Sequence, residues 1–574
     1  MLFFNSKKKL AMPWKKFYND SDLNMNIPDI NMYDQIRRTS LITPNSIAYE
    51  YFSTKVKYKK FIKQIDKAAI AFKRLGIKKG NIVTICMPNT PEALISLYAL
   101  NKLGAICNML LPLSATEEIK QSLNSTKSKM LIVIDLLYDK VREIINQTNV
   151  KKVIFVSASD SMHLPMKIGY KLMNFKKYEH WHRTDKFMSW NDLMFKSIFA
   201  SKYRFKKYGK DTPAVILHSG GTSGKPKNVV LQNRSFILLS KQCKIILNYV
   251  DNFDSCLAIL PNFHGFGLGV SMHIIFAMGF KVILVPQFDS KKFDTLLKKK
   301  RPSIIFGVPT LFEALINSNN EKDLDLSFLK LAISGGDSLS SNLEDRVNDY
   351  LKEHNAPCQI TQGYGLSEAL AAVCLGFKGV NKKGSIGIPL PGNYIKIIDP
   401  STRETMPYGE VGEICIHTEA LMMGYLDNEV ETNQALQIHK DGYVWLHTGD
   451  LGYMDEDGFV FYKARQKRMI ITSGFNVYPS HVESVIESHP AVLQCTVVAM
   501  PHPYKQEVPK AFIVLKEGFH GLFIKNEIKE YCKKNLEHHM VPYKFVYRKK
   551  LPKTKLGKVD FKQLQADNGD DDDE

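Results

Sequence analysis

The chain has 574 residues and a formal net charge of +20 at pH 7; 44% of its residues are hydrophobic and 24% are charged. This composition is that of a globular protein and excludes a disordered chain or a collagen-like repeat, and the length suggests about three to four domains of roughly 150 residues. The positive charge indicates an anionic partner. This partner could be a nucleotide, a coenzyme, a lipid headgroup or a nucleic acid.

Cysteine usage and the N-terminus indicate the compartment. The nine cysteines include no CxxC pair and no zinc-type histidine spacing, which argues against a disulfide scaffold and for a reducing environment. The apolar start is too short for a signal peptide, and no run of about 18 apolar residues predicts a membrane span. We expect a cytoplasmic protein, with peripheral contact at the inner face of the membrane as an open alternative.

The first elements in chain order predict a parallel sheet. Trp14, Phe17 and Tyr18 are expected to fasten an N-terminal arm onto a core. Hydrophobic periodicity then predicts helices over 61–77 and 92–105 and strands over 81–88 and 130–135. Such alternation is typical of a mostly parallel sheet with helices on its faces.

The pattern breaks at 157–210, where basic, aromatic and apolar residues mix. This segment is interpreted either as a solvated surface excursion or as a basic amphipathic stretch that contacts an anionic membrane. The alternation of predicted strands and helices resumes at 213 and continues to about 400. The sequence after 405 predicts a β-rich subdomain.

A further unit is expected from about 467. It contains predicted strands at 495–500 and 511–516 and a helix around 525–535. Ser480 and Glu483 have the spacing of a capping box, which predicts a helix start after Pro479.

The loop after the strand at 214–217 is suited to phosphate. It reads SGGTSGKPK, and its three glycines let the backbone approach a ligand and form an anion nest. Its hydroxyls and lysines add donors and positive charge. A Walker A loop is excluded, because only three residues separate Gly220 from Gly224 and because Pro226 and a predicted strand follow instead of a helix.

SGGTSGKPK resembles the phosphate loop of the adenylate-forming (AMP-binding) superfamily of acyl-CoA synthetases, adenylation domains and firefly-type luciferases. The resemblance implies that the loop binds the phosphates of ATP and that Thr222 also contributes to a metal site. The nucleotide-binding residues that it implies are Ser219, Gly220, Gly221, Thr222, Ser223, Gly224 and Lys227.

Two segments extend the resemblance to the acyl and adenine parts of the site. PNFHGFGLG (261–269) is similar to the family segment whose histidine lines the acyl pocket, which implies a place among the catalytic groups for His264. A histidine satisfied in the core is the alternative. AISGGDSLS (332–340) is similar to the segment along the adenine and implies contacts from Gly335 and Gly336, although Asp337 replaces a small apolar residue.

QGYGLSEA (362–369) resembles the highly specific family motif YGxTE, with Ser367 in place of the threonine. The resemblance implies that the purine stacks on Tyr364, that Gly365 borders the nucleotide and that Ser367 donates to the α-phosphate. It further implies that Glu368 binds Mg²⁺, because a carboxylate oxygen is a hard ligand.

The C-terminal third supplies the remaining groups. TGD and ARQK resemble family motifs that imply ribose binding by Asp450, a ribose or phosphate contact by Arg465, and a hinge at Lys467. The segment 471–483 resembles the family segment whose glycine flanks the pantetheine tunnel, which implies that Gly474 contacts coenzyme A. PKTKLGK resembles the C-terminal motif with the catalytic lysine, here Lys558.

The resemblance covers about residues 30–565. It implies an α/β fold with a large N-terminal AMP-binding part (1–466), made of two α/β subdomains and a β-rich subdomain, and a small mobile α+β lid (467–574). The implied activity is an AMP-forming acid–thiol ligase that uses ATP, Mg²⁺ and coenzyme A. A fatty acid is the expected substrate, and the N-terminal region, with MPWKKFY, MYDQIRR and the ICMPNTPE segment, looks most like bacterial fatty acyl-CoA synthetases.

Alternatives remain open at the level of substrate and assembly. The substrate could be an aryl acid instead of a fatty acid. The acyl acceptor could be a carrier-protein thiol instead of coenzyme A. Nucleic acid is not expected as a partner despite the basic charge, because the sequence has no zinc-finger spacing, RNP-like strand or basic-region heptad. The sequence is compatible with either a monomer or a homodimer.

Overall fold

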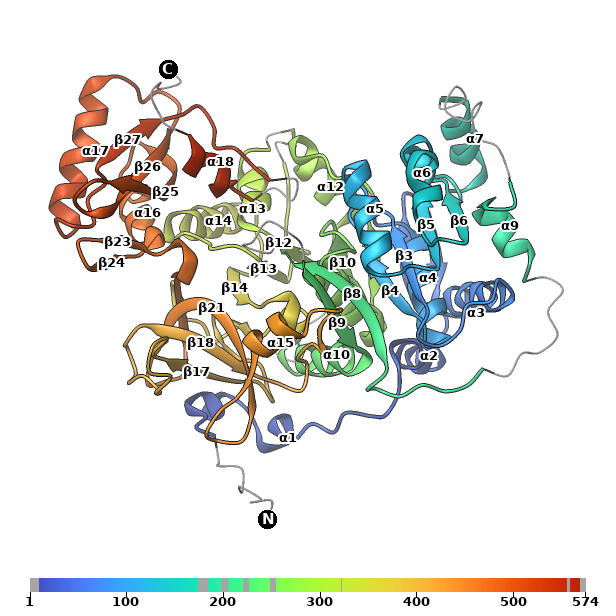
Figure 1. Ribbon diagram of the computed structural model, residues 1–574. Coiled ribbons are helices and arrows are strands. Elements are labelled where there is room, and N and C mark those ends of the chain that lie inside the picture. The colour runs from blue at the N-terminus through green and yellow to red at the C-terminus, as the bar shows by residue number, and fades with distance from the viewer. Residues whose placement is uncertain are drawn as a thin grey trace, which may run out of the picture.

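The computed structural model describes residues 10–173, 184–197, 205–219, 227–247, 254–318, 320–321, 323–554 and 558–567. The structure contains two mostly parallel sheets whose strands interleave along the chain, a smaller antiparallel sheet and a separate C-terminal α+β unit (Figure 1). The predicted fold class is therefore confirmed. All nine cysteines lie in the described part and are free thiols.

The first large sheet has eight strands in the order β19-β9-β8-β4-β3-β5-β6-β7. Strands β8 to β7 run parallel, and β9 and β19 are antiparallel additions at one edge. The strands are β3 (Ile82–Cys86), β4 (Ile106–Met109), β5 (Met130–Ile134), β6 (Lys152–Val156), β7 (Phe187–Ser189), β8 (Pro213–Ser219), β9 (Lys227–Gln232) and β19 (Gly424–Tyr425).

The second large sheet has nine strands in the order β16-β15-β14-β13-β12-β10-β11-β1-β2. Its six central strands are parallel, with antiparallel strands at both edges. The strands are β1 (Ile47–Tyr51), β2 (Thr54–Lys57), β10 (Ser255–Ala258), β11 (Lys281–Leu284), β12 (Ile304–Gly307), β13 (Leu331–Gly335), β14 (Ile360–Tyr364), β15 (Cys374–Leu375) and β16 (Ile388–Pro389).

Helices cover the faces of both sheets, and one continuous apolar core joins the two layers. The predicted helices over 61–77 and 92–105 are confirmed as α3 and α4. The α-helices of this part are α1 (Asp20–Leu23), α2 (Met32–Ile42), α3 (Tyr58–Arg74), α4 (Pro91–Lys102), α5 (Thr116–Ser125), α6 (Tyr138–Ile144), α7 (Leu164–Met173), α9 (Trp190–Phe195), α10 (Asn233–Leu247), α11 (Ile275–Met278), α12 (Phe293–Lys300), α13 (Pro309–Ile316) and α14 (Ser341–Glu353). A π-helix, η4 (Phe266–Ile274), precedes α11. Short 3₁₀ helices are η1 (Pro13–Phe17), η2 (Asp135–Leu137), η3 (Ile145–Gln147), η5 (Ser290–Lys292) and η6 (Ser367–Ala369).

The β-rich subdomain is a five-stranded antiparallel sheet, and the N-terminal arm packs beside it. Trp14 is buried, Phe17 meets Phe459 edge to face, and the Tyr18 hydroxyl donates to the carbonyl of Pro389 at 3.0 Å. The predicted anchoring of the arm is confirmed. The subdomain contains β17 (Tyr394–Ile398), β18 (Gly412–His417), α15 (Glu429–Ala435), β20 (Leu436–Ile438), β21 (Val444–Met454) and β22 (Val460–Arg465).

The C-terminal unit has its own five-stranded sheet and its own core (Figure 1). The predicted boundary at 466/467 falls in the short turn η7 (Gln466–Arg468), which joins β22 to β23. The unit contains β23 (Ile470–Thr472), β24 (Phe475–Val477), α16 (Pro479–Glu487), β25 (Val492–His502), β26 (Gln506–Leu515), α17 (Leu522–Asn535), β27 (Lys544–Tyr547) and α18 (Phe561–Ala566).

The predicted capping box is wrong. Helix α16 has Tyr478 as its N-cap and starts at Pro479, whose fixed φ and missing N–H suit the first helical position. The Ser480 hydroxyl instead donates to the carbonyl of Lys463, which ties the lid to the β-rich subdomain. Glu483 accepts the backbone N–H of Val497 at 2.8 Å, so both side chains have tertiary partners.

The described parts of the segment 157–210 contain more regular secondary structure than either sequence interpretation required. β7 pairs in parallel with β6 and extends the eight-stranded sheet, and α9 packs on α3. Helix α7 precedes them and exposes Leu164, Ile168 and Leu172. Residues 174–183 and 198–204 of the segment lie outside the described part. Among the described residues no helix combines the length and the apolar character that crossing a bilayer requires.

Candidate active site

A cleft of about 1530 Å³ lies where the two large sheets, the β-rich subdomain and the lid meet. It contains all but one of the predicted site residues that the structure describes. These are Ser219, Lys227, His264, Gly335, Gly336, Tyr364, Gly365, Ser367, Glu368, Asp450, Arg465, Lys467 and Lys558. Gly474 is the exception, because it lies at the exposed tip of the β23–β24 hairpin.

The loop residues Gly220, Gly221, Thr222, Ser223 and Gly224 lie outside the described part, so their implied phosphate and metal contacts stay predictions. The strands on both sides are described: Ser219 ends β8 and pairs with Lys227, the first residue of β9. Both flanking residues line the cleft. The two described residues that border the loop therefore lie at the cleft wall.

Tyr364, Asp450 and Arg465, from three strands, form one group joined by a hydrogen bond and an ion pair. The Tyr364 hydroxyl donates to Asp450 Oδ2 at 2.7 Å, and Arg465 Nε lies 2.8 Å from Asp450 Oδ1. Asp450 and Arg465 are cross-strand partners on β21 and β22, which fixes their separation. Burial raises the pKa of Asp450 above its ordinary value, and the positive charge of Arg465 opposes that rise. The hydrogen bond from the Tyr364 hydroxyl to Asp450 holds the Tyr364 ring at the cleft wall.

Glu368 is held by a residue that the sequence interpretation missed. The Tyr425 hydroxyl donates to Glu368 Oε1 at 2.9 Å, and the Met422 N–H donates to the Glu368 carbonyl at 2.7 Å. Lys227 lies 3.1 Å from Glu431 Oε2 and over the Tyr425 ring. Tyr425 belongs to the short edge strand β19, and no sequence signal marked it, because its contact with Glu368 spans 57 residues.

Glycine is required at one turn beside Tyr364. A Cβ on Gly365 would lie 1.1 Å from the carbonyl oxygen of Ala371, so any side chain would displace that backbone. The turn then places Ser367 and Glu368 in η6 at the cleft wall. On the facing strand end, Gly336 has a φ of +78°, and its carbonyl accepts the Lys558 ammonium. The lid thus inserts Lys558 beside the glycine pair of β13.

His264 lies beside Lys558. Burial lowers the pKa of His264 to about 4, and the charge of Lys558 adds to the effect. His264 Nδ1 accepts the Phe266 N–H at 3.3 Å, which leaves the proton of the neutral ring on Nε2. The sequence interpretation of His264 as a pocket residue agrees with this position in the cleft wall.

A second histidine of the cleft was not singled out from the sequence. His218 Nε2 lies 2.8 Å from Asn108 Oδ1, and burial lowers the pKa of His218 to about 4. Asn108 is itself held by Thr84 at 2.9 Å. The only sequence signal was its place immediately before Ser219, at the end of the strand that enters the phosphate loop.

One end of the cleft is apolar. Helix α10 contributes Cys243, Ile246 and Leu247, and η4 contributes Val270 and Ile274. These side chains carry no charge and adjoin the His264 segment. The cleft therefore has an apolar end suited to a hydrocarbon and a polar end that holds carboxylates, a guanidinium and an ammonium.

Sequence comparisons agree with this geometry. Residues 36–426 match the profile of the AMP-binding enzyme family, and residues 481–558 match that of the AMP-binding enzyme C-terminal domain. The chain is 30% identical over 552 residues to a long-chain-fatty-acid–CoA ligase of Bacillus subtilis, covering 95% of this chain and 96% of that one. It is 32% identical over 468 residues to a probable 4-coumarate–CoA ligase of Dictyostelium discoideum, covering 79% and 80%.

The fold also matches solved structures. The ATP-bound crystal structure of MatB from Rhodopseudomonas palustris superimposes with a TM-score of 0.80 at 22% identity, covering 94% of this chain and 98% of that chain. The resemblance predicted from the sequence motifs is confirmed, and with it the reaction class of an AMP-forming acid–thiol ligase. By the extent of these matches, the chain belongs to the AMP-binding enzyme family.

Proposed function

We propose that the protein is a carboxylate–CoA ligase that activates a fatty acid in two steps. In the first, a carboxylate oxygen attacks the α-phosphorus of ATP, acyl-AMP forms and pyrophosphate leaves. In the second, the thiol of coenzyme A attacks the acyl carbonyl, the thioester forms and AMP leaves. The observation that carries the proposal is the convergence of Lys558, Glu368 and Asp450 on one cleft with an apolar end.

Nucleotide binding is assigned to the polar end. The Tyr364 ring would stack on the purine, and Asp450 would accept the ribose hydroxyls while Arg465 and the Tyr364 hydroxyl hold its carboxylate. Gly335 and Gly336 would border the adenine, and Ser367 would donate to the α-phosphate. The ammonium of Lys558 would offset the charge that develops on the phosphate oxygens during carboxylate attack.

Glu368 fits a Mg²⁺ site. It lines the cleft, and its hydrogen bond from Tyr425 holds the carboxylate in one orientation. Carboxylate oxygens are the protein ligands that Mg²⁺ prefers, together with phosphate oxygens. When bound there, the ion would supply positive charge to the phosphates of ATP.

The lid is assigned to both half-reactions in different orientations. Here Lys558 contacts Gly336 inside the cleft while Gly474 lies outside it, an arrangement suited to acyl-AMP formation. Rotation of the lid at Lys467 would withdraw Lys558 and bring Gly474 to the cleft for coenzyme A. One chain would then serve two transition states by domain closure.

The substrate is assigned from the apolar end of the cleft. Its wall from α10 and η4 suits an aliphatic chain, and the matched Bacillus subtilis relative carries the name of a long-chain-fatty-acid ligase. An aryl acid is the alternative, because the Dictyostelium relative is named a probable 4-coumarate ligase, and a carrier-protein thiol is the alternative acceptor. Pyrophosphate release measured over saturated acids of graded length and 4-coumarate, with and without coenzyme A, separates these outcomes. Turnover of the aryl acid alone would overturn the fatty-acid assignment.

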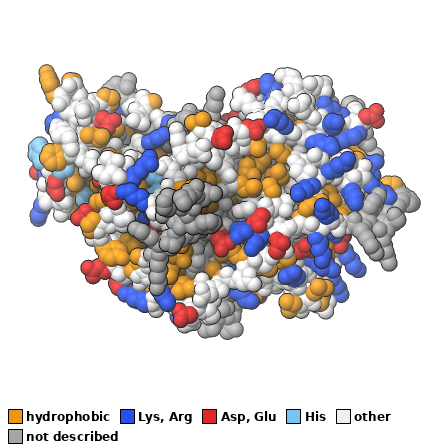
Figure 2. Space-filling view, turned by 60° about the horizontal axis from the view of Figure 1, so that its bottom comes forward, with side chains coloured by type: hydrophobic (Ala, Val, Ile, Leu, Met, Phe, Trp, Pro, Cys, Tyr) orange, Lys and Arg blue, Asp and Glu red, His pale blue; other side chains and the backbone are white. Residues whose placement is uncertain are grey.

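Weak peripheral membrane contact is assigned to α7 and the basic surface near it. Leu164, Ile168 and Leu172 project from one side of α7 and are 51–71% exposed. Figure 2 shows Lys and Arg side chains gathered over the end of the molecule where Figure 1 places α3, α7 and α9. Apolar groups beside positive charge suit an anionic lipid surface.

A further inference from the structure

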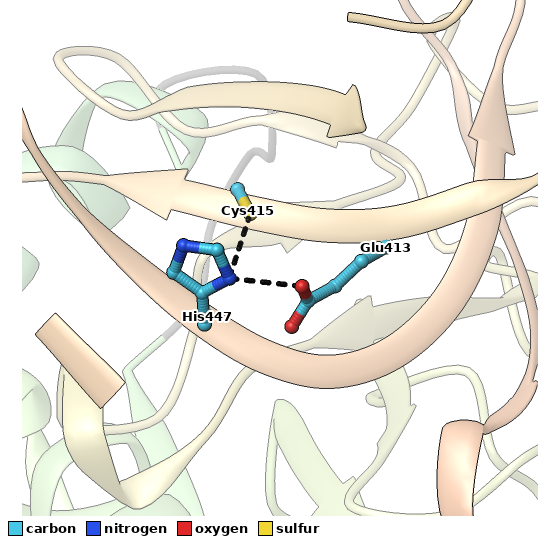
Figure 3. Close-up of side chains that lie close together, drawn as sticks. All are labelled: Glu413, Cys415 and His447. Atoms are coloured by element: carbon cyan, nitrogen blue, oxygen red, sulfur yellow. Dashed lines mark hydrogen bonds and ion pairs between the residues drawn. The ribbon is translucent and has the colours of Figure 1, made fainter. Parts of the chain in front are cut away.

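The β-rich subdomain gathers three metal-binding types of side chain beside the cleft (Figure 3). Glu413 and Cys415 lie two residues apart on β18 and point to the same side of the sheet. His447 of β21 is the cross-strand partner of Cys415. His447 Nδ1 lies 2.9 Å from Glu413 Oε2 and 3.9 Å from Cys415 Sγ.

We propose that Glu413, Cys415 and His447 form a binding site for Zn²⁺ or a similar borderline-soft divalent ion. One oxygen, one sulfur and one nitrogen, all within 4.8 Å of one another, lie close enough to coordinate a single ion. Thiolate and imidazole ligands favour zinc over magnesium, which prefers oxygen. A carboxylate, a thiolate and a neutral imidazole balance the charge of a divalent ion, and binding releases the thiol proton.

A fourth side chain supports His447 as a ligand. His439 Nε2 lies 2.9 Å from His447 Nε2, on the opposite side of the ring from Glu413 and Cys415. A neutral His447 whose Nε2–H donates to His439 presents a bare Nδ1 to the ion. Such outer hydrogen bonds fix the tautomer and orientation of metal-binding histidines.

The site also connects to the nucleotide end of the cleft. Glu413 Oε1 accepts the Gly449 N–H at 2.9 Å, while Oε2 is the oxygen nearest to His447. Glu413 and His447 both line the cleft, so a water molecule reaching them from that side would complete a four-coordinate ion. An ion there would join β18 to β21 directly before Asp450. None of the three side chains has a role in the proposed adenylation chemistry.

Zinc binding by the full-length protein tests the proposal. The chelator-treated protein is titrated with Zn²⁺ against a chromogenic zinc chelator, and with Co²⁺ to record thiolate-to-cobalt charge-transfer absorption. We expect one zinc equivalent that excess Mg²⁺ does not displace, with cobalt absorption that identifies a thiolate ligand. Cys415→Ala should abolish both the bound zinc equivalent and the cobalt charge-transfer absorption. Cys374→Ala, which removes another buried thiol, should retain both.

Two further variants separate coordination from folding. His447→Gln should remove the zinc equivalent, and His439→Gln should weaken binding by about 10- to 100-fold, as loss of an outer hydrogen bond does. Thermal unfolding of each variant, measured in the presence of chelator, identifies the variants that retain the fold. Loss of zinc binding by folded Cys415→Ala or folded His447→Gln supports the site. Native protein that binds no zinc, or a folded Cys415→Ala that binds it unchanged, overturns the proposal. These readouts do not use ligase activity, so they are independent of the proposed function.

Discussion

The hydroxyl of Tyr425 donates a 2.9 Å hydrogen bond to Oε1 of Glu368. This bond joins edge strand β19 to the turn η6, and both residues line the cleft. Tyr425 acts through Glu368 and is therefore a positioning residue. Without its hydroxyl the carboxylate would keep its charge and lose its fixed orientation.

Tyr425→Phe should lower kcat for acyl-AMP formation by about 10- to 100-fold, because a hydrogen bond to a charged group contributes about 1.5–3 kcal/mol. The Mg²⁺ concentration for half-maximal rate should rise, which a merely structural role would not produce. Pyrophosphate release against Mg²⁺ measures both effects. Tyr408→Phe, at an exposed tyrosine, is the control. An unchanged Mg²⁺ titration would remove Tyr425 from this role.

Glu368→Gln should raise the Mg²⁺ requirement more than Tyr425→Phe does and should slow adenylation. A neutral amide is a poorer ligand for a hard cation than a carboxylate is. The measurement is the same Mg²⁺ titration, with Glu410→Gln, outside the cleft lining, as the matched control. If the Glu368 variant titrates like the native enzyme, the metal site lies elsewhere.

Lys558→Ala should slow acyl-AMP formation by about 10²–10³-fold, the usual effect of removing one electrostatic contact to a transition state. Thioester formation from supplied acyl-AMP should be largely retained, because Lys558 is assigned only to the first step. Separate assays of the two half-reactions measure this. Lys562→Ala, an exposed lysine on α18, is the control. Equal losses in both half-reactions would show that Lys558 is structural.

Lys467→Pro should allow acyl-AMP formation and stop transfer to coenzyme A. Lys467 lies in the 3₁₀ turn η7. The φ typical of a 3₁₀ turn lies close to the φ that proline fixes, so the present lid orientation should tolerate the change. A fixed φ should prevent rotation to the second orientation, and pyrophosphate release should stall after one turnover. Lys467→Ala controls for loss of the side chain. Full acyl-CoA turnover by the proline variant would show that rotation at Lys467 is not needed.

Leu164→Asp combined with Ile168→Asp should reduce co-sedimentation with anionic vesicles, and Lys171→Glu should reduce it further. Each basic residue near an anionic surface contributes about 1 kcal/mol, so binding should also fall with added salt. Phe523→Asp, at an exposed apolar residue of the lid helix α17, is the control. Binding that is insensitive to all three α7 substitutions would contradict the assignment. Met162, in the same amphipathic stretch, is buried and takes no part.

The sequence by itself determined the family and the α/β class, and it predicted most of the residues that the structure gathers in the cleft. Its motifs are contiguous, and local periodicity locates strands and helices because side chains repeat every 2 or 3.6 residues. Thus the motifs at 364–368 and 448–450 predicted, without coordinates, residues that line the polar end of the cleft. The same local reasoning failed at α16, where Ser480 and Glu483 have tertiary partners instead of capping each other. It also missed β7, a three-residue strand that exists because β6 offers an edge.

Tertiary structure alone decided which side chains meet across the chain. Tyr364 and Asp450 are 86 residues apart, Tyr425 and Glu368 are 57 apart, and Lys558 reaches Gly336 across 222 residues. Such contacts depend on strand order and on how the lid sits, and neither leaves a local pattern in the sequence. The cluster of Glu413, Cys415 and His447 has the same origin, because the antiparallel register of β18 and β21 brings His447 beside Glu413 and Cys415 from more than 30 residues away.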